Sequence, residues 1–228
     1  LQYHISCYPH VVPEKFAVLA GNQTGGRLLR WYRDRLAFEE KQLAAEAGID
    51  VYEAITRQVT DEPSQLWVLP YFAGSGTVED DPQATGAILG LTFETTRADI
   101  VKAILEGITY EQALTIRILD SLGLPIRRVM AVGGGARSPI WLQMKANILG
   151  KVVQTTLVEE ASTLGAALLA GWGTGVYASL DDAVAQTVAH QRQFNPEADL
   201  SQQYQEALDI YQTLYAMLKP FYVRTARS

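Results

Sequence analysis

The sequence predicts an α/β domain with one mixed, roughly five-stranded sheet that carries helices on both faces. Strand-like apolar segments come in pairs in the first half of the 228-residue chain, and strand-like and helical segments alternate in the second half. Paired strands favour antiparallel neighbours, whereas alternation of strands and helices favours parallel strands covered by helices. An apolar fraction of 48% and a charged fraction of 19% are typical of a globular protein with a substantial core.

The first half is expected to hold two pairs of strands with helices between them, because apolar alternation gives way to helical spacing and then returns. The expected elements are, in chain order, strands at 2–8 and 15–19, a helix that ends near 36, helices at 38–47 and 50–59 that make an insert over about 38–60, and strands at 66–72 and 86–92. A Gly/Asp/Pro-rich loop over 74–83 separates the last two strands.

A long amphipathic helix is expected to open the second half at Thr96. Thr96 and Asp99 have the spacing of a capping box, and Gly123 with Pro125 marks the end of the helix. The elements expected after residue 150 are a strand at 151–157, a small-residue helix capped by Ser162 or Thr163, and amphipathic helices at 180–192 and 200–218, the last one ended by Pro220.

The most informative stretch, residues 128–150, is a short apolar strand followed by three glycines and a helix start. Glycine has no Cβ and tolerates positive φ, so the backbone at 133–135 can turn sharply and let a ligand approach its N–H groups. Ser138 suits an N-cap, Pro139 the first helical position and Gly150 the C-terminal stop. The stretch is therefore a candidate nucleotide site, although a tight strand-to-helix turn without a ligand explains the glycines equally well.

Charge and composition exclude several classes of function. A net charge of −6 without a run of basic residues argues against a nucleic-acid or anionic-membrane surface. Cys7 is the only cysteine, so no internal disulfide is possible and a cytoplasmic location is expected. No apolar run approaches the roughly 20 residues of a membrane span. The three histidines lack ligand spacing, so no dedicated metal site is expected. A chain that opens with Leu1 inside a strand-like segment is expected to be a piece of a longer protein.

Several segments together resemble the FGGY carbohydrate kinases, a family of the actin-like ATPase superfamily. Residues 86–107, GAILGLTFETTRADIVKAILEG, are similar to the C-terminal signature of the family, and VGGGARSP resembles its adenosine motif. The sequences ANILG, EEASTLGAALLAG and GGRLLRWYRD resemble further segments of the xylulokinase-like and glycerol kinase-like members. The resemblance covers about residues 15–220.

The resemblance implies that residues 1–228 are the C-terminal, nucleotide-binding domain of such a kinase, with an actin-like (ribonuclease H-like) fold. The complete enzyme would use ATP with Mg²⁺ to phosphorylate a sugar or polyol, a pentulose such as xylulose being favoured. The catalytic aspartate and the Gly-Thr-Gly phosphate hairpin of the family precede this chain. The resemblance therefore implies no catalytic residue here, Mg²⁺ held mainly by the nucleotide and the N-terminal domain, and no activity of this chain alone.

The same resemblance implies the nucleotide-binding residues. Gly134, Gly135 and Ala136 match the Gly-Gly-Ala against which the adenosine lies, and Gly26 matches a glycine near the nucleotide. Arg30 matches a polar position, which is glutamine in glycerol kinases, although a solvated arginine explains this residue better. Pro139 stands where those relatives carry an adenine-contacting asparagine, so the base preference stays open.

Two loop features depart from the family pattern or suggest other chemistry. The loop PYFAGSGTVEDDP lacks the Glu-Arg pair of the family, which leaves its role open. Asp80 and Asp81 are adjacent acids on a turn bounded by proline, and a solvated loop explains them better than a metal site.

Two other classes of function remain. One is a noncatalytic nucleotide-sensing or assembly module of the actin-like superfamily, which the upstream sequence would distinguish from a kinase. The other, a dinucleotide-binding domain, is disfavoured because the chain has no GxGxxG fingerprint. The sugar and the oligomeric state stay undetermined, and the late amphipathic helices are a possible homodimer surface.

Overall fold

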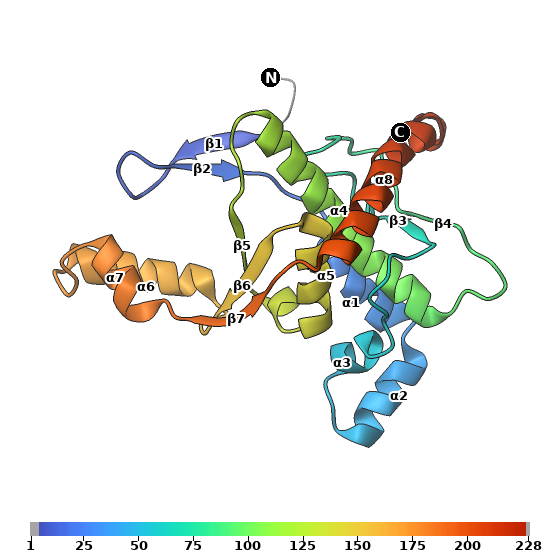
Figure 1. Ribbon diagram of the computed structural model, residues 1–228, viewed down its shortest axis with the longest axis horizontal. Coiled ribbons are helices and arrows are strands. Elements are labelled where there is room, and N and C mark those ends of the chain that lie inside the picture. The colour runs from blue at the N-terminus through green and yellow to red at the C-terminus, as the bar shows by residue number, and fades with distance from the viewer. Residues whose placement is uncertain (1–4, 227–228) are drawn as a thin grey trace.

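One long helix, α4 (Arg97–Ser121), runs through the centre of the protein in the computed structural model, which describes residues 5–226 (Figure 1). It begins with the expected capping box: the hydroxyl of Thr96 accepts from the N–H of Asp99, and the Asp99 carboxylate accepts from the N–H of Thr96. Residues 101–111 are all buried. A helix that is enclosed on every side belongs to the core, and α4 is the central helix of the main core.

A short antiparallel hairpin packs on α4. Its strands are β3 (Trp67–Leu69) and β4 (Ala87–Leu89), which are shorter than the expected strands. At Gly107 a Cβ would lie 2.2 Å from the carbonyl oxygen of Val68, so only glycine lets the strand approach the helix this closely. The segment 86–107 therefore contains one strand of the hairpin and the glycine of α4 at which the hairpin packs.

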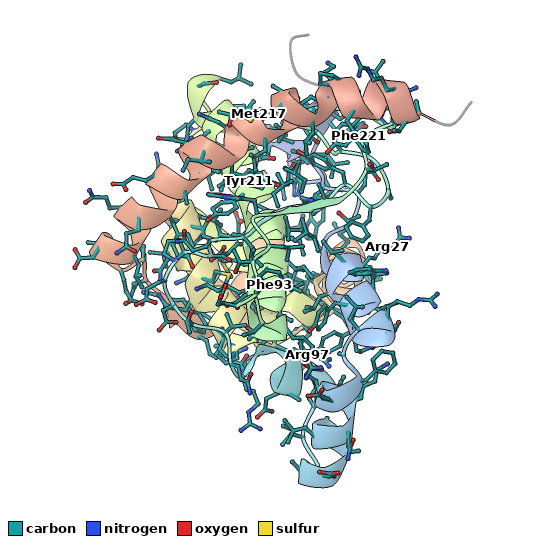
Figure 2. The ribbon with its side chains drawn as sticks, turned by 90° about the vertical axis from the view of Figure 1, so that its right-hand side faces the viewer. Arg27, Phe93, Arg97, Tyr211, Met217 and Phe221 are labelled. Carbon is teal, nitrogen blue, oxygen red and sulfur yellow. The ribbon has the colours of Figure 1, made fainter. Side chains whose placement is uncertain are left out.

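The two helices expected at 38–47 and 50–59 are both present, the second one shorter than expected. α1 (Gly26–Arg35) is followed by α2 (Phe38–Ala47) and α3 (Val51–Thr56). Asp50 caps α3 by accepting from the N–H of Tyr52 at 2.8 Å. Arg97, at the start of α4, lies beside this insert (Figure 2) and pairs with Glu39 and Glu40 of α2.

Two further groups of strands lie away from that hairpin. β1 (Ser6–Pro9) and β2 (Phe16–Leu19) form an exposed antiparallel ribbon. Residues 2–4 of the first expected strand lie outside the described residues. β5 (Arg128–Ala131), β6 (Val152–Thr156) and β7 (His190–Phe194) form a sheet in the order β5–β6–β7, in which β5 is parallel and β7 antiparallel to β6.

The α/β class is confirmed, but the single five-stranded sheet is wrong. The described strands form separate sheets of two, two and three strands. The β3–β4 hairpin packs on α4, α4 packs on α5 (Pro139–Leu149), and α5 packs on β6, so two helices separate these sheets. The β1–β2 ribbon stands apart from both (Figure 1).

Helices do not cover both faces of the β5–β6–β7 sheet as expected. α5 covers one face, where Val153 and Ala131 are buried with Leu142 of the helix. On the other face Met130 is exposed, and α6 (Ala161–Gly173) and α7 (Leu180–Thr187) project away from the sheet (Figure 1). α6 also begins earlier than expected: Glu160 is its N-cap, without a side-chain hydrogen bond, so the capping role of Ser162 or Thr163 is wrong.

The helix expected at 180–192 is wrong in its second half. α7 ends at Thr187, and β7 then pairs with β6, Phe194 opposite Val153 and Gln193 opposite Gln154. The edge of β6 offers backbone partners that a longer α7 would leave unpaired. Tertiary pairing therefore overrides the helical pattern.

The last helix, α8 (Ala198–Thr225), does not end at Pro220 but continues past it. Proline removes one N–H and frees the carbonyl of residue 216, and Ala216 is exposed, so water can satisfy that carbonyl. Beyond the proline, Tyr222 is fully buried and packs near Tyr215, which holds the last turns in place. None of the helices in the described part of the chain combines the length and apolar character needed to cross a membrane.

Candidate functional site

The glycine-rich loop lies between β5 and α5, as the sequence predicts. Gly133 has φ 72°, a left-handed conformation that favours glycine, and residues Gly134–Ala136 form a single 3-10 turn. The hydroxyl of Ser138 accepts from the N–H of Trp141 at 3.3 Å, Pro139 opens α5, and Gly150 closes it in the left-handed conformation. The loop is therefore a defined turn capped on the side of the helix.

The three residues expected to face adenosine occupy different environments. Gly134 is exposed, and nothing lies within 4 Å of the place where its Cβ would be. Gly135 is half-buried, and its Cβ would lie 3.1 Å from the ring of Trp141. Ala136 is buried. Gly134 thus offers the open surface, whereas the glycine at 135 also serves close packing of the loop on α5.

Side chains from distant segments hold the loop in place. Nη2 of Arg192, on β7, donates to the carbonyl oxygen of Ala136 at 2.7 Å. Arg137 pairs with Glu159 in the loop after β6 at 2.5 Å, and the N–H of Gly133 donates to the Glu159 carbonyl at 3.4 Å. The turn after β5 is therefore tied to β7 and to the loop that follows β6.

A buried lysine and a tryptophan lie beneath the loop. Trp141 is buried, and its Nε1 donates to Oγ1 of Thr109 on α4 at 3.1 Å. Nζ of Lys145, one turn further along α5, lies 4.0 Å from the centre of the Trp141 ring. Burial lowers the pKa of Lys145 to about 8.

The sequence analysis identified neither Lys145 nor Arg192 as a site residue. Lys145 carried a signal that could have been used, because a lysine interrupts the apolar residues of the helix WLQMKANIL. Arg192 carried none, since it was placed at the end of a helix and the structure puts it on β7.

Gly26 and Arg30 lie on α1, which packs on α2, α3 and α4, whereas the glycine loop packs on α5. Both residues are exposed. α4 packs against both α1 and α5. Their role at a nucleotide stays a prediction.

The loop over 74–83 is hydrogen-bonded to the loop before α1. Gly21 and Thr77 exchange two hydrogen bonds, the Gly21 N–H donating to Oγ1 of Thr77 at 2.8 Å and the Thr77 N–H donating to the Gly21 carbonyl at 2.9 Å. Asp81 accepts from the hydroxyl of Tyr215 on α8 at 2.8 Å. The carboxylate of Asp81 therefore joins the loop to the last helix.

The described residues do not fit a metal site of their own. Within residues 5–226 no group of three or more His, Cys, Asp and Glu side chains could hold a metal ion. A cavity of about 540 Å³ contains Glu39, Glu40 and Glu46, but it lies between the insert and the start of α4, away from the glycine loop. Arg97 pairs with two of these glutamates.

The model for the C-terminal domain of the FGGY family of carbohydrate kinases matches residues 3–174. The chain belongs to this family. The FGGY chain is similar to the xylulose kinase of Staphylococcus epidermidis, at 28% identity over 221 residues, which are 95% of this chain and 42% of that protein. It is 31% identical to the gluconokinase of Bacillus subtilis over 227 residues, 97% of this chain and 44% of that protein.

Solved structures show the same fold for this FGGY chain. The crystal structure of xylulose kinase from Rhodospirillum rubrum superposes with a TM-score of 0.81 at 29% identity, covering 96% of this chain and 43% of that one. Glycerol kinase from Plasmodium falciparum, solved with ADP, superposes with a TM-score of 0.68 at 20% identity over 86% of this chain and 38% of that one, a likeness of fold alone. The chain spans less than half the length of these relatives.

Proposed function

We propose that the chain is the nucleotide-binding part of an ATP-dependent carbohydrate kinase, and that the loop Gly133–Ala136 is its adenosine surface. The observation that carries the proposal is the open backbone at Gly134, at the turn between a parallel strand and a capped helix in a chain of this family. A flat ligand can lie against this backbone because no side chain stands above it.

The proposed reaction is transfer of the γ-phosphoryl group of ATP to a carbohydrate hydroxyl. The hydroxyl oxygen bonds to the γ-phosphorus as the bond from that phosphorus to the bridging oxygen of ADP breaks, and a carboxylate takes the hydroxyl proton. We place that carboxylate outside this chain, in the part that the relatives have and this chain does not cover. The described residues then position the nucleotide, which is the main requirement of such a transfer.

The preferred acceptor is a sugar or polyol, with a pentulose such as xylulose favoured. Relatives named as xylulose kinase and as gluconokinase match the chain about equally well, at 28% and 31% identity. A panel of sugars and sugar acids tested with the longer protein distinguishes these acceptors. A higher kcat/KM for gluconate than for xylulose would overturn the preference for a pentulose.

Binding of ADP to the 228-residue chain tests the site. We expect weak binding, with a Kd of about 0.1 to 10 mM, because half of a two-domain cleft lacks the closure that excludes water. In ¹⁵N-labelled protein, ADP should shift the amide resonances of residues 133–138 and, if the prediction for α1 holds, that of Gly26.

Gly134→Val is the informative variant, with Gly173→Val as its control. Both glycines are exposed and have nothing within 4 Å of a Cβ, but Gly173 lies at the far end of α6. Gly134→Val should keep the fold and abolish the ADP shifts, whereas Gly173→Val should leave them unchanged. Gly135→Val is less informative, because it presses on Trp141. Saturating ADP without shifts at 133–138 in folded wild-type protein would contradict the proposal.

A further inference from the structure

Lys145 is a buried cation without a counter-charge among the residues that the structure describes. It is 9% exposed. Among residues 5–226 its ammonium group forms neither an ion pair nor a hydrogen bond, and it lies 4.0 Å from the centre of the Trp141 ring. No charged side chain contributes to the lowering of its pKa, which comes from burial alone. A buried charge without a partner destabilises a fold, and such groups concentrate at functional sites.

The ammonium group lies against the glycine loop. A Cβ on Gly135 would lie 3.6 Å from Nζ of Lys145, so the glycine leaves that side of the loop open to the charge. Several polar atoms in the described part of the chain are fully enclosed and lack a partner, but Nζ of Lys145 is not one of them. The exposed fraction of Lys145 therefore includes its ammonium group. A ligand seated at the loop can therefore meet this charge.

Arg192 adds a second positive charge beneath the same loop. Its Nη2 donates to the Ala136 carbonyl at 2.7 Å, and its Nε is enclosed without a partner among the described residues. Glu159, the acid that contacts the loop, is already paired with Arg137 at 2.5 Å. The inner side of the loop is therefore positive although the whole chain carries a net charge of −6.

We infer that Lys145 makes the loop select phosphorylated nucleosides: its ammonium group meets a phosphate of the nucleotide, and this contact distinguishes AMP, ADP or ATP from adenosine. The inference rests on the proposed function, since it assumes that the nucleotide binds at Gly133–Ala136. The inference adds Lys145, which lies outside the Gly-Gly-Ala match, to the proposed nucleotide site. It also gives a chemical reason for the burial of this lysine. The phosphate of the nucleotide would be the counter-charge that Lys145 lacks among the described residues. A charge-assisted contact is strong where few water molecules surround it.

Binding of adenosine, AMP and ADP to wild type, Lys145→Met and Lys151→Met tests the inference by calorimetry or amide shifts. Lys151 is the matched control: it precedes β6, at the opposite end of the parallel β5–β6 pair from the glycine loop, and its Nζ lies 3.9 Å from Asp120. Lys145→Met should weaken ADP binding by about tenfold or more, the scale of one charged contact, and leave adenosine binding within about twofold. Lys151→Met should leave the affinity for both adenosine and ADP unchanged.

Thermal unfolding separates this role from a structural one. Removal of an unpaired buried charge should leave the unfolding midpoint of Lys145→Met unchanged or raise it. A structural lysine would behave differently: the midpoint would fall, and adenosine and ADP would weaken together, which would overturn the inference.

Wild-type protein gives a second measurement if Lys145→Met does not fold. The affinity for ADP relative to adenosine should decrease as the pH rises through about 8, where Lys145 loses its proton. The same ratio at pH 7 and pH 9.5 would overturn the inference. Binding of neither ligand at the loop would instead reject the proposed function, so the two failures are distinguishable.

Discussion

Two buried carboxyl groups on α4 are the most unusual residues of the core. Glu106 accepts from the N–H of Ser64 at 3.0 Å and from the hydroxyl of Tyr204 at 3.1 Å. Glu111 accepts from the hydroxyls of Tyr71 and Tyr211, both at 2.9 Å. Burial raises the pKa of each glutamate to about 7. The charge of Lys102 opposes this rise at Glu106, and the hydrogen bonds oppose it at both glutamates, but only in part. These carboxyl groups join α4 to the neighbouring segments. Their contribution to the free energy of unfolding of the protein depends on pH.

We predict that Glu106→Gln flattens the pH dependence of stability between about pH 4.5 and 7. The folded-state pKa of Glu106 is about 7 and its ordinary value is 4.5. A raised pKa contributes stability that is fully present below 4.5 and is lost as the pH rises through 7. For wild type, this residue should lower the free energy of unfolding by up to about 3 kcal/mol across that window.

Urea unfolding of both proteins at a series of pH values measures this effect. Glu206→Gln is the control, because Glu206 is exposed on α8. Parallel pH curves for wild type and Glu106→Gln would contradict the prediction.

At the scale of elements, α8 closes the core with a row of tyrosines. Tyr204, Tyr211, Tyr215 and Tyr222 are buried along one side of the helix, and Figure 2 shows Tyr211 on the side that faces α4. The first three hydroxyls donate to Glu106, Glu111 and Asp81, respectively. The hydroxyl of Tyr222 is enclosed without a partner among the described residues. The buried side of α8 extends beyond Pro220 to Tyr222, and the packing of this residue keeps the chain helical past the proline.

Tyr222→Ala should destabilise the protein by about 3 kcal/mol, because it empties a fully buried aromatic site. Phe221→Ala is the matched control: the ring is 55% exposed and should cost less than about 1 kcal/mol. Tyr222→Phe should be neutral or slightly stabilising, since it removes an unpaired buried hydroxyl. Chemical denaturation measures all three changes. Equal losses for the two alanine variants would mean that Tyr222 does not hold the end of α8.

At the scale of the whole molecule, the chain carries the fold of an FGGY kinase segment and less than half the length of its relatives. The glycine loop, Lys145 and Arg192 form one side of a candidate site, and no metal-binding group lies within residues 5–226. A site of this kind needs a facing surface to enclose the phosphates and the acceptor. A homodimer through the late helices stays a prediction.

We predict that the 228-residue chain alone does not phosphorylate xylulose, a hexulose, glycerol or gluconate. The physical reason is that we place the catalytic carboxylate and the facing phosphate grip outside this chain, so we expect ATP to bind weakly and the acceptor hydroxyl to lack a base. A coupled assay of ADP release across these acceptors should stay at the blank rate. The longer protein is the positive control, and turnover by the chain alone would refute the assignment of the catalytic base.

The sequence by itself determined the local features and the family. The Thr96 and Asp99 capping box, the Ser138 cap and the left-handed Gly150 lie where their spacing placed them. Such features depend on a few neighbouring residues and on steric rules that hold in any fold. The FGGY resemblance followed from the same kind of information, since motif spacing is preserved along the chain.

Tertiary structure alone decided how distant segments meet. β7 forms because the edge of β6 is available, and that strand brings Arg192 to the carbonyl of Ala136. The sheets stay separate because α4 and α5 lie between two of them. Lys145 becomes an unpaired buried charge only when α5 packs beneath the glycine loop. Burial, pairing and charge environment depend on contacts between residues far apart in sequence, and local patterns do not specify those contacts.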